Sequence, residues 1–261
     1  MSGRLLIMLY AVASYAVFLG SFVWAVGFVG NYNYLTAKSI DVGVSSAVTE
    51  AVVVDALLLA LFAIQHSVMA RPAFKRALTR IIPAAAERST YVLLSSLILL
   101  LLFWQWRPIP NPVWHVEGVA AGVLTGVHWL GWLIALSSTY MIDHFDLFGL
   151  RQAVLALRGS AGTAQPFRTP LLYRLVRHPL MLGFLLAFWA TPEMSVGHLL
   201  FAALSTAYIL VGLQLEERDL IAQFGDTYQR YRRRVPMLLP RLIGGRRTAE
   251  TETEAEARGA Q

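Results

Sequence analysis

The 261-residue chain is too apolar to be a water-soluble globule. Hydrophobic residues make up 56% of it and Asp, Glu, Lys and Arg only 15%, against about 45–50% and 25% in a typical soluble domain. Cysteine is absent, which excludes disulfide scaffolds, iron–sulfur clusters, cysteine zinc sites and thiolate nucleophiles. The net charge of +6 comes from arginines that flank apolar segments, so membrane topology explains it and no nucleic-acid partner is expected.

Stretches without charged residues define the expected helices, because a bilayer is crossed by about 20 mostly apolar residues. Four spanning helices are expected, over residues 5–30, 47–70, 89–106 and 118–142. Residues 178–215 form a further apolar stretch, broken near Thr191-Pro192-Glu193, that is too long for one crossing and predicts a tight helical hairpin. The expected fold class is therefore all-α, a polytopic transmembrane bundle of four spanning helices and a C-terminal hairpin.

Polar segments connect these helices. The prolines that follow Arg107 exclude a helix there, since proline lacks an amide hydrogen and disfavours helix in the preceding residue. Residues 147–157 predict an amphipathic helix along the membrane surface. We expect one domain over 1–244 and a disordered tail over 245–261, which is rich in Thr, Glu and Ala.

The distribution of Lys and Arg predicts the orientation in the membrane. With the N-terminus in the cytoplasm, twenty of these residues lie on the cytoplasmic side and only Lys38 and Arg107 lie outside. Loops rich in Lys and Arg stay in the cytoplasm. Both termini are therefore expected on the cytoplasmic side.

Eight ionisable groups are expected to gather at the cytoplasmic ends of four segments. His66 lies about 7 Å inside the end of its span, at 1.5 Å per residue. The other seven are Asp143, His144, Asp146, Arg177, His178, Glu216 and Glu217. Ionisable groups at membrane depth are costly and indicate function. Interfacial charges also mark where helices leave the bilayer, so the deep histidine and the paired glutamates carry more weight than the others.

Other polar or small residues on the spans have structural interpretations. His128, near mid-membrane, is expected to be a hydrogen-bonded core residue, and Asp55 is expected to make a packing hydrogen bond near the outer interface. Gly118, Gly122 and Gly126 form two overlapping GxxxG motifs, which predict the close approach of another helix.

A set of C-terminal motifs identifies a family resemblance. The set consists of Arg177-His178-Pro179, then Glu216-Glu217, then Phe224-Gly225, Tyr228, Tyr231 and Val235-Pro236. It resembles the core of the isoprenylcysteine carboxyl methyltransferase superfamily, which includes phospholipid N-methyltransferases, over about residues 171–240.

Upstream segments at 65–70, 87–91, 143–149 and 188–192 are similar to one branch, the bacterial membrane methanethiol S-methyltransferases. The resemblance implies an enzyme of the bacterial cytoplasmic membrane that uses S-adenosylmethionine to convert methanethiol to dimethyl sulfide. It also implies a cytoplasmic segment that covers this cofactor. Many superfamily members have tyrosine two residues after the proline of the first motif, where this chain has Met181. That departure indicates a smaller or more apolar acceptor site.

The resemblance also implies the site residues. Those assigned to the cofactor are Tyr173, Arg177, His178, Gly183, Glu216 and Glu217. A guanidinium binds a carboxylate in bidentate fashion, which suits the arginine, and either glutamate suits the ammonium or the ribose hydroxyls. A thiol reacts as the thiolate, so we expect a histidine base, either His66 or His144, oriented by Asp143 or Asp146. No metal is expected.

Two alternatives stay open. Within the same chemistry, the acceptor is a lipid amine or a prenylcysteine carboxylate, which needs a lateral opening between helices. In a different class, the His66 segment resembles a denitrification-associated membrane family that includes a haem-dependent carotene isomerase, with His66 and a second histidine as axial ligands. A transporter is disfavoured because the polar groups lie at one face. The expected partners are a small thiol and the bilayer, and the sequence leaves the oligomeric state open.

Overall fold

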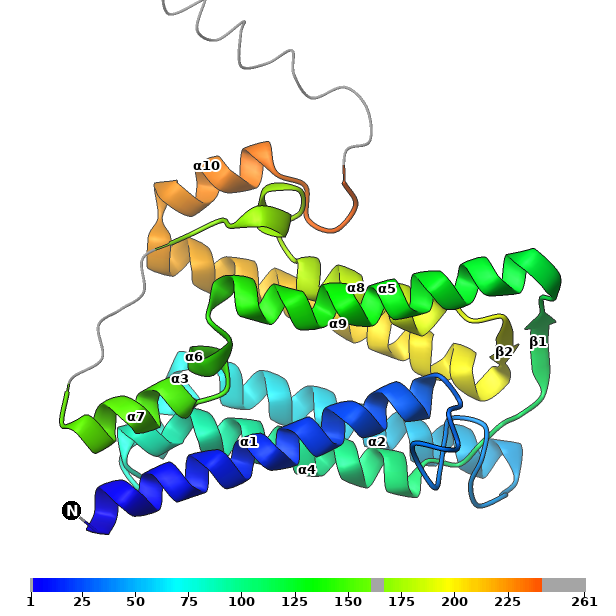
Figure 1. Ribbon diagram of the computed structural model, residues 1–261, viewed down its shortest axis with the longest axis horizontal. Helices are drawn as coiled ribbons and strands as arrows, with labels where there is room; N and C mark the ends of the chain where they lie inside the picture. The colour runs from blue at the N-terminus through cyan, green and yellow to red at the C-terminus, as the bar shows by residue number, and fades with distance from the viewer. Residues whose placement is uncertain (1, 161–166, 241–261) are drawn as a thin grey trace, which may run out of the picture.

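The computed structural model describes residues 2–160 and 167–240, and within them it is a bundle of roughly parallel and antiparallel helices (Figure 1). Five helices in these ranges are long and apolar enough to cross a membrane. They are α1 (Ser2–Val29), α2 (Val48–Ala70), α4 (Ala84–Gln105), α5 (Gly118–Ile142) and α9 (Val196–Phe224). The expected all-α, polytopic membrane bundle is confirmed. The tail expected over 245–261 lies outside the described residues.

One end of the bundle carries a small two-stranded sheet. Strand β1 (Pro112–His115) precedes α5, and β2 (Glu193–Ser195) lies between the short helix α8 (Pro179–Trp189) and α9. The strands pair antiparallel, and the amide of Val116 also donates to the carbonyl of Pro192 at 2.9 Å. The turn of the 178–215 hairpin therefore lies beside the connection between α4 and α5, at the end predicted to face outward.

The hairpin's second helix is longer than the sequence analysis predicts. Helix α9 continues without a break through Glu216 and Glu217 to Phe224, nine residues beyond the expected end of the hairpin. The end of a charge-free stretch indicates where the chain leaves the membrane. It does not indicate where the helix ends, because a helix continues in water when its residues favour helix. The charged last turns of α9 therefore stand beyond the apolar span.

The opposite end carries the short elements. These are α3 (Pro72–Leu78), α6 (His144–Leu147), α7 (Leu150–Arg158), the 3₁₀ helix η1 (Leu171–Arg174) and α10 (Asp226–Arg234). Helix α7 packs against α1 and α4 and runs alongside α1, with the two axes in nearly the same direction (Figure 1). A helix is therefore present within the predicted region 147–157, over Leu150–Arg158, but it lies along the bundle and not along the membrane surface as the sequence predicts.

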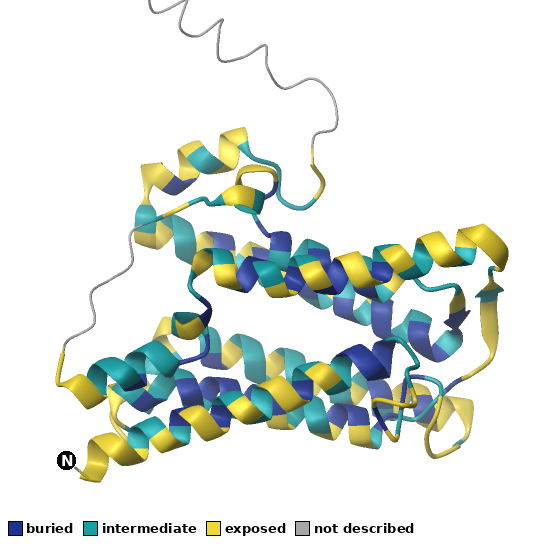
Figure 2. Ribbon diagram, in the orientation of Figure 1, coloured by how far each residue is buried: buried dark blue, intermediate teal, exposed yellow. Residues whose placement is uncertain are grey.

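Aromatic side chains fill the core toward the end of the bundle that carries the two-stranded sheet. The rings of Phe28 and Phe103 lie 4.8 Å apart, and Trp106, in contact with both Phe28 and Phe201, donates its indole N–H to the carbonyl of Ile40 at 3.0 Å. Figure 2 shows buried residues along the facing sides of the helices and exposed residues on their outward sides. Many of the exposed ones are apolar, including Leu57, Ile64 and Leu133, as expected for a surface that contacts lipid.

Two structural expectations for polar residues are confirmed. Asp55 is fully buried and its Oδ1 accepts the backbone amide of Arg107 at 2.9 Å. This bond fixes the start of the proline-rich turn to α2. His128 is buried, with Nδ1 2.8 Å from the carbonyl of Ala187, and its Nε2 accepts the indole N–H of Trp132 at 3.1 Å. It links α5 to α8.

The expected glycine contact is elsewhere on α5. A Cβ added at Gly118, Gly122 or Gly126 would meet no atom within 4 Å among the described residues, so the close approach predicted for these glycines is not made by a described helix of this chain. The close approach occurs further along, where a Cβ at Gly131 would lie 2.6 Å from the carbonyl oxygen of Gly183. Helices α5 and α8 cross there backbone to backbone.

Candidate active site

A buried ion pair joins the start of α8 to α9. Pro179 occupies the first turn of α8, where its missing amide costs no hydrogen bond. Because α8 begins at Pro179, Arg177 and His178 lie directly before the helix. The Nε of Arg177 donates to Glu217 Oε1 at 2.6 Å, and the two side chains are only 9% and 7% exposed. Removing one partner of an ion pair this short and this buried destabilises the folded protein strongly, because the other charge is left buried and unpaired.

His178 extends the ion pair into a cluster. Its Nε2 lies 3.2 Å from Glu217 Oε1, and its Nδ1 lies 3.7 Å from Glu216 Oε2. The Nε of Arg232, on α10, approaches the second oxygen of Glu217 at 3.3 Å. Glu217 is thus surrounded by three nitrogen donors. Glu216 is half exposed and keeps most of its hydrogen-bonding capacity.

The segment after α9 is fastened onto this cluster, and we call residues 226–238 the C-terminal strap. The amides of Arg177 and His178 donate to the carbonyls of Pro236 and Met237, at 2.9 and 3.2 Å. The Nη1 of Arg177 also donates to the carbonyls of Arg232 and Val235, at 3.1 and 2.6 Å. Arg177 therefore holds both Glu217 and the strap.

Three tyrosines line the junction between the strap and η1. Tyr231 donates its hydroxyl to the carbonyl of Tyr173 at 2.5 Å. Burial raises the pKa of Tyr231 to about 12, and burial together with the nearby charge of Glu216 raises that of Tyr173. Tyr228 is 1% exposed and its hydroxyl has no hydrogen-bond partner among the described residues. The site prediction omits Tyr228, although its place in the FGxxY motif could have identified it.

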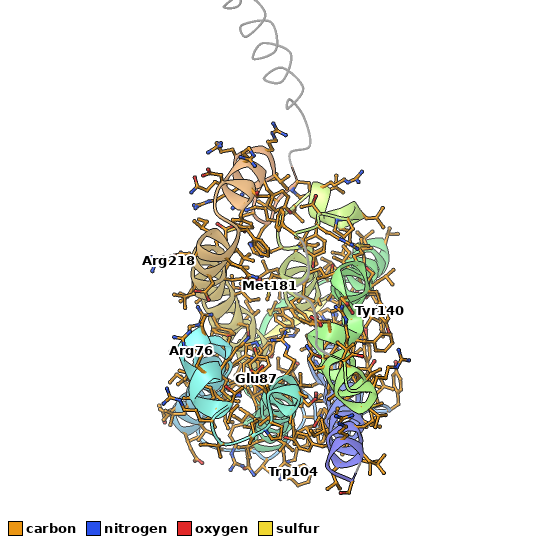
Figure 3. The ribbon with its side chains drawn as sticks, turned by 90° about the vertical axis from the view of Figure 1, so that its left-hand side faces the viewer. Arg76, Glu87, Trp104, Tyr140, Met181 and Arg218 are labelled. Carbon is orange, nitrogen blue, oxygen red and sulfur yellow. The ribbon has the colours of Figure 1, made fainter. Side chains whose placement is uncertain are left out.

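Met181 lies at the end of the bundle that carries the ionic cluster. Figure 3 looks onto this end, with Met181 between Arg218 of α9 and Tyr140 of α5 in the view and Glu87 of α4 below it. Met181 is on the first turn of α8, three residues after His178. The residue that departs from the superfamily pattern therefore lies about one helical turn after His178 of the ionic cluster.

His66 belongs to a second group of residues, on α2, α4 and α9. Its Nε2 lies 2.7 Å from the hydroxyl of Tyr91, and its Nδ1 lies 3.2 Å from that of Ser95. The rings of Phe62 and Tyr208 cover it. The histidine is thus enclosed by hydroxyls and aromatic rings, and within the described part of the chain it makes no hydrogen bond to a carboxylate.

His144 lies in a third group, against α1. Its Nε2 is 2.7 Å from the hydroxyl of Tyr15 and its Nδ1 is 2.7 Å from that of Thr139, so both nitrogens are engaged. Burial lowers its pKa. Asp143 and Asp146 approach Arg151 instead, at 3.2 and 3.5 Å.

The eight predicted groups therefore do not all meet: four of them form one connected cluster, and the other four lie at separate places. Arg177, His178, Glu216 and Glu217 come together, and Tyr173 is joined to them through the strap. His66 and His144 each lie among hydroxyls on other helices. Gly183 lies at the α5–α8 crossing. The described residues hold no group of three or more His, Asp or Glu residues with metal-binding geometry.

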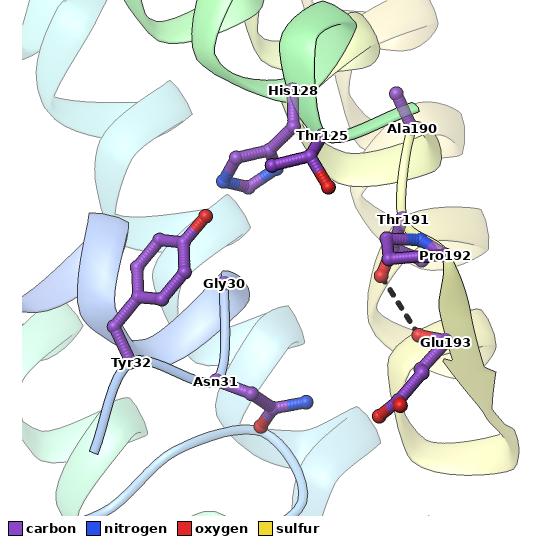
Figure 4. Close-up of a pocket in the computed structure, with 9 residues that line it drawn as sticks. All are labelled: Gly30, Asn31, Tyr32, Thr125, His128, Ala190, Thr191, Pro192 and Glu193. Atoms are coloured by element: carbon purple, nitrogen blue, oxygen red, sulfur yellow. Dashed lines mark hydrogen bonds between the residues drawn. The ribbon is translucent and has the colours of Figure 1, made fainter. Parts of the chain in front are cut away.

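A small pocket lies at the end of the bundle that carries the two-stranded sheet, far from the ionic cluster. It has a volume of about 130 Å³ and is lined by Tyr32, Thr125 and His128 on one side and by residues 190–193 on the other (Figure 4). Thr125 and both nitrogens of His128 are already hydrogen-bonded within the protein. This pocket offers few free polar groups for catalysis.

Comparisons with known proteins agree on a family. Residues 56–215 match the NnrU protein family. The chain is 68% identical to Methanethiol S-methyltransferase 2 of Bradyrhizobium diazoefficiens, over 97% of both chains. It is 56% identical to Methanethiol S-methyltransferase of Mycobacterium tuberculosis, over 91% of this chain and 97% of the relative. Nurim of Danio rerio is 29% identical over 66% of each chain. No solved structure matches. The resemblance inferred from the motifs is confirmed.

Proposed function

The chain belongs to the NnrU protein family and to the methanethiol S-methyltransferases, and we propose that it methylates methanethiol to dimethyl sulfide with S-adenosylmethionine as donor. It is a membrane methyltransferase and therefore needs a methyl donor. The observation that carries the proposal is the full-length similarity to enzymes named for this acceptor. We place the protein in the bacterial cytoplasmic membrane, with the Arg177–Glu217 cluster on the cytoplasmic side, where the donor is made.

The cluster has the groups that this donor needs. S-adenosylmethionine presents a carboxylate, an ammonium and a sulfonium. Glu216 is a half-exposed carboxylate beside His178, which suits the ammonium or a ribose hydroxyl. The Nε and Nη1 of Arg177 are engaged within the protein, so its Nη2 would meet the donor carboxylate. The unpartnered hydroxyl of Tyr228 is a further buried donor that a ligand would satisfy. These features support binding by Tyr173, Arg177, His178 and Glu216, with Glu217 holding Arg177 and His178 in place.

The donor supplies an electrophilic methyl group, so the protein's task is to position the thiol and remove its proton. Holding two reactants in line removes much of the entropic barrier. A simple thiol is mostly protonated at neutral pH and reacts as the thiolate. We assign the proton acceptor to His66, whose imidazole lies at the end of a span among Tyr91, Ser95 and two aromatic rings. His144 is the second candidate: the nitrogens of both histidines lie near hydroxyls, but His66 lies within the spanning helix α2, whereas His144 lies beyond the end of α5.

Headspace gas analysis tests the activity. Cells that express the protein and are fed methanethiol should release dimethyl sulfide well above the level of cells with empty vector. The Glu216→Gln variant, expressed at equal level, is the control for contributions from the host. If dimethyl sulfide stays at the empty-vector level while the purified protein binds S-adenosylmethionine, the acceptor assignment is wrong.

A second experiment tests the base. His66→Ala should keep its donor affinity but lose turnover by about 10²–10⁴-fold at neutral pH. The loss should shrink as pH rises, because thiolate from solution then replaces the missing base. His144→Ala is the matched control and should show no such pH rescue. Wild-type turnover in both variants at neutral pH would mean that the enzyme captures preformed thiolate, and the assignment of His66 would be abandoned.

A further inference from the structure

The solvent-exposed face of the C-terminal strap, the face turned away from the bundle, is strongly basic. Helix α10 turns its buried Tyr228 toward the bundle, while four arginines of the same helix are exposed. They are Arg230, Arg232, Arg233 and Arg234. Only Arg232 has an ion pair in the described structure, with Glu217. The remaining positive charge is not compensated by acidic side chains of the described residues within ion-pair distance.

Exposed leucines lie on the segments beside these arginines. Leu239, directly after the strap, is 77% exposed, and Leu171 and Leu175, in and after η1, are 69% and 57% exposed. The bonds from Arg177 and His178 to Pro236 and Met237 hold the two segments together. We call the four arginines and these three leucines the basic–apolar surface. Exposed apolar residues next to basic ones are typical of segments that lie in a membrane interface.

The length of the helices places this surface at the level of the lipid headgroups. The charge-free part of α9 ends at Leu215, and the helix runs nine residues further, about 13 Å at 1.5 Å per residue. At Gly225, with φ of 53°, the chain reverses, and α10 runs back for another nine residues (Figure 1). Its last turn therefore returns to the depth of Glu217, which the contact between Arg232 and Glu217 shows directly.

We propose that the basic–apolar surface binds the headgroups of anionic phospholipids in the cytoplasmic leaflet and so holds the strap closed on Arg177 and Glu217. Clusters of Lys and Arg next to a membrane-spanning helix attract the negative surface of this leaflet. The leucines insert between the acyl chains, where they lose their contact with water. The occupant is a lipid surface, because the arginines follow directly from a spanning helix and lie at its exit level.

Lipid binding by this surface reaches the candidate active site through the strap. The carbonyls of Arg232 and Val235 accept hydrogen bonds from Arg177, which in turn holds Glu217. A strap fixed on anionic lipid keeps these bonds formed and the donor site assembled. This consequence rests on the proposed function, whereas the lipid contact itself does not.

Hydrogen–deuterium exchange in nanodiscs tests the lipid contact without any donor. One nanodisc contains only phosphatidylcholine and the other contains an equimolar mixture with phosphatidylglycerol. Amides of residues 226–238 should exchange about tenfold more slowly in the anionic nanodisc. In the variant Arg230→Gln/Arg233→Gln/Arg234→Gln this difference should disappear. Arg232 is left unchanged because it contacts Glu217.

A second triple variant controls for the loss of three charges. Arg76→Gln/Arg80→Gln/Arg158→Gln removes three exposed arginines at the same end of the bundle, away from the strap. It should keep the lipid-dependent protection of residues 226–238. Equal exchange of the wild-type strap in both nanodiscs, or equal loss of protection in both variants, would overturn the proposal.

Calorimetry in the same nanodiscs tests the consequence for the site. The wild-type protein should bind S-adenosylmethionine several-fold more tightly in the anionic nanodisc, and the strap variant should bind equally in both. Lipid-dependent protection without any donor binding would contradict the proposed function and leave the lipid contact standing. Donor binding that is equal in both nanodiscs, with protection intact, would overturn the coupling to the site.

Discussion

Two adjacent glutamates on α9 have opposite surroundings. Glu217 is 7% exposed and is held by Arg177, His178 and Arg232, whereas Glu216 is 50% exposed. Neighbouring residues on a helix point about 100° apart, so one faces α8 and the strap while the other faces open space. Under the proposed function the two carboxylates have different tasks: Glu217 holds the site together and Glu216 binds the donor.

The paired variants Glu216→Gln and Glu217→Gln should separate these tasks. Glu216→Gln should weaken S-adenosylmethionine binding by about tenfold or more, since a hydrogen bond to a charged group is lost, and leave the unfolding temperature unchanged. Glu217→Gln should lower stability by about 3–5 kcal/mol, because Arg177 is left buried without its counter-charge. Calorimetry and thermal unfolding measure the two effects. A Glu216→Gln protein that binds the donor normally would remove this residue from the site.

Burial of His144 makes stability sensitive to acid. Burial lowers the pKa of His144 below its ordinary value of about 6.5, so the unfolded chain binds the proton more tightly than the folded one. The stability from the neutral imidazole is present above about pH 6.5 and is lost as pH falls toward the lower folded pKa. Wild-type protein should therefore lose more unfolding temperature between pH 7.5 and 5, roughly the range over which histidines titrate, than His144→Gln. Equal losses in the two proteins would contradict this prediction.

The sequence predicts how far along its helix a residue lies better than it predicts which side chains surround that residue. Both histidine candidates lie near the ends of their helices, as the charge-free stretches predict. The rotation of a helix and the identity of the facing helix depend on packing between distant segments. Tyr15, Thr139 and Tyr91, which surround the two histidines, therefore lay beyond the reach of sequence reasoning. The Arg177–Glu217 cluster was predictable because its motifs came as a set.

At the scale of elements, the α5–α8 crossing depends on two glycines that face each other. The backbones approach so closely that a Cβ at Gly131 would lie 2.6 Å from the amide nitrogen of Ala187 and from the carbonyl of Gly183. The GxxxG motifs at residues 118–126 also place small residues on one face of α5, but no described atom lies within 4 Å of a Cβ added at their glycines. A motif of small residues shows that another helix can approach closely. Where the close approach occurs depends on the residues of the facing helix.

Gly131→Ala and Gly122→Ala test this difference on one helix. Gly131→Ala should destabilise the protein by about 1–3 kcal/mol, as overpacking does in a close-packed interior. Gly122→Ala should be neutral or stabilise by up to about 1 kcal/mol, because alanine is the better helix former. Thermal unfolding in one detergent measures both. If Gly122→Ala were the more damaging change, the crossing would lie elsewhere on α5.

At the scale of the whole molecule, the two ends of the bundle have different chemistry. One end has a short sheet, a core of aromatic rings and a small pocket with few free polar groups. The other end has the ion-pair cluster, the strap and, among the described residues, nearly all of the arginines. This polarity was predictable because Lys and Arg counts set it. The strap was not, since its fastening uses backbone carbonyls that any sequence provides.

Single introduced cysteines test which end faces the cytoplasm, and the absence of native cysteine makes the labelling free of background from the chain itself. Val44 is 50% exposed in the loop between α1 and α2, and Ser160 is exposed after α7, at the opposite end. In intact cells, a membrane-impermeant maleimide should label Val44→Cys and leave Ser160→Cys unmodified until the membrane is permeabilised. The physical reason is the twenty-to-two distribution of Lys and Arg between the two sides. The reverse pattern would turn Glu216 and Tyr228 away from the cytosol, and a donor made there could not reach them.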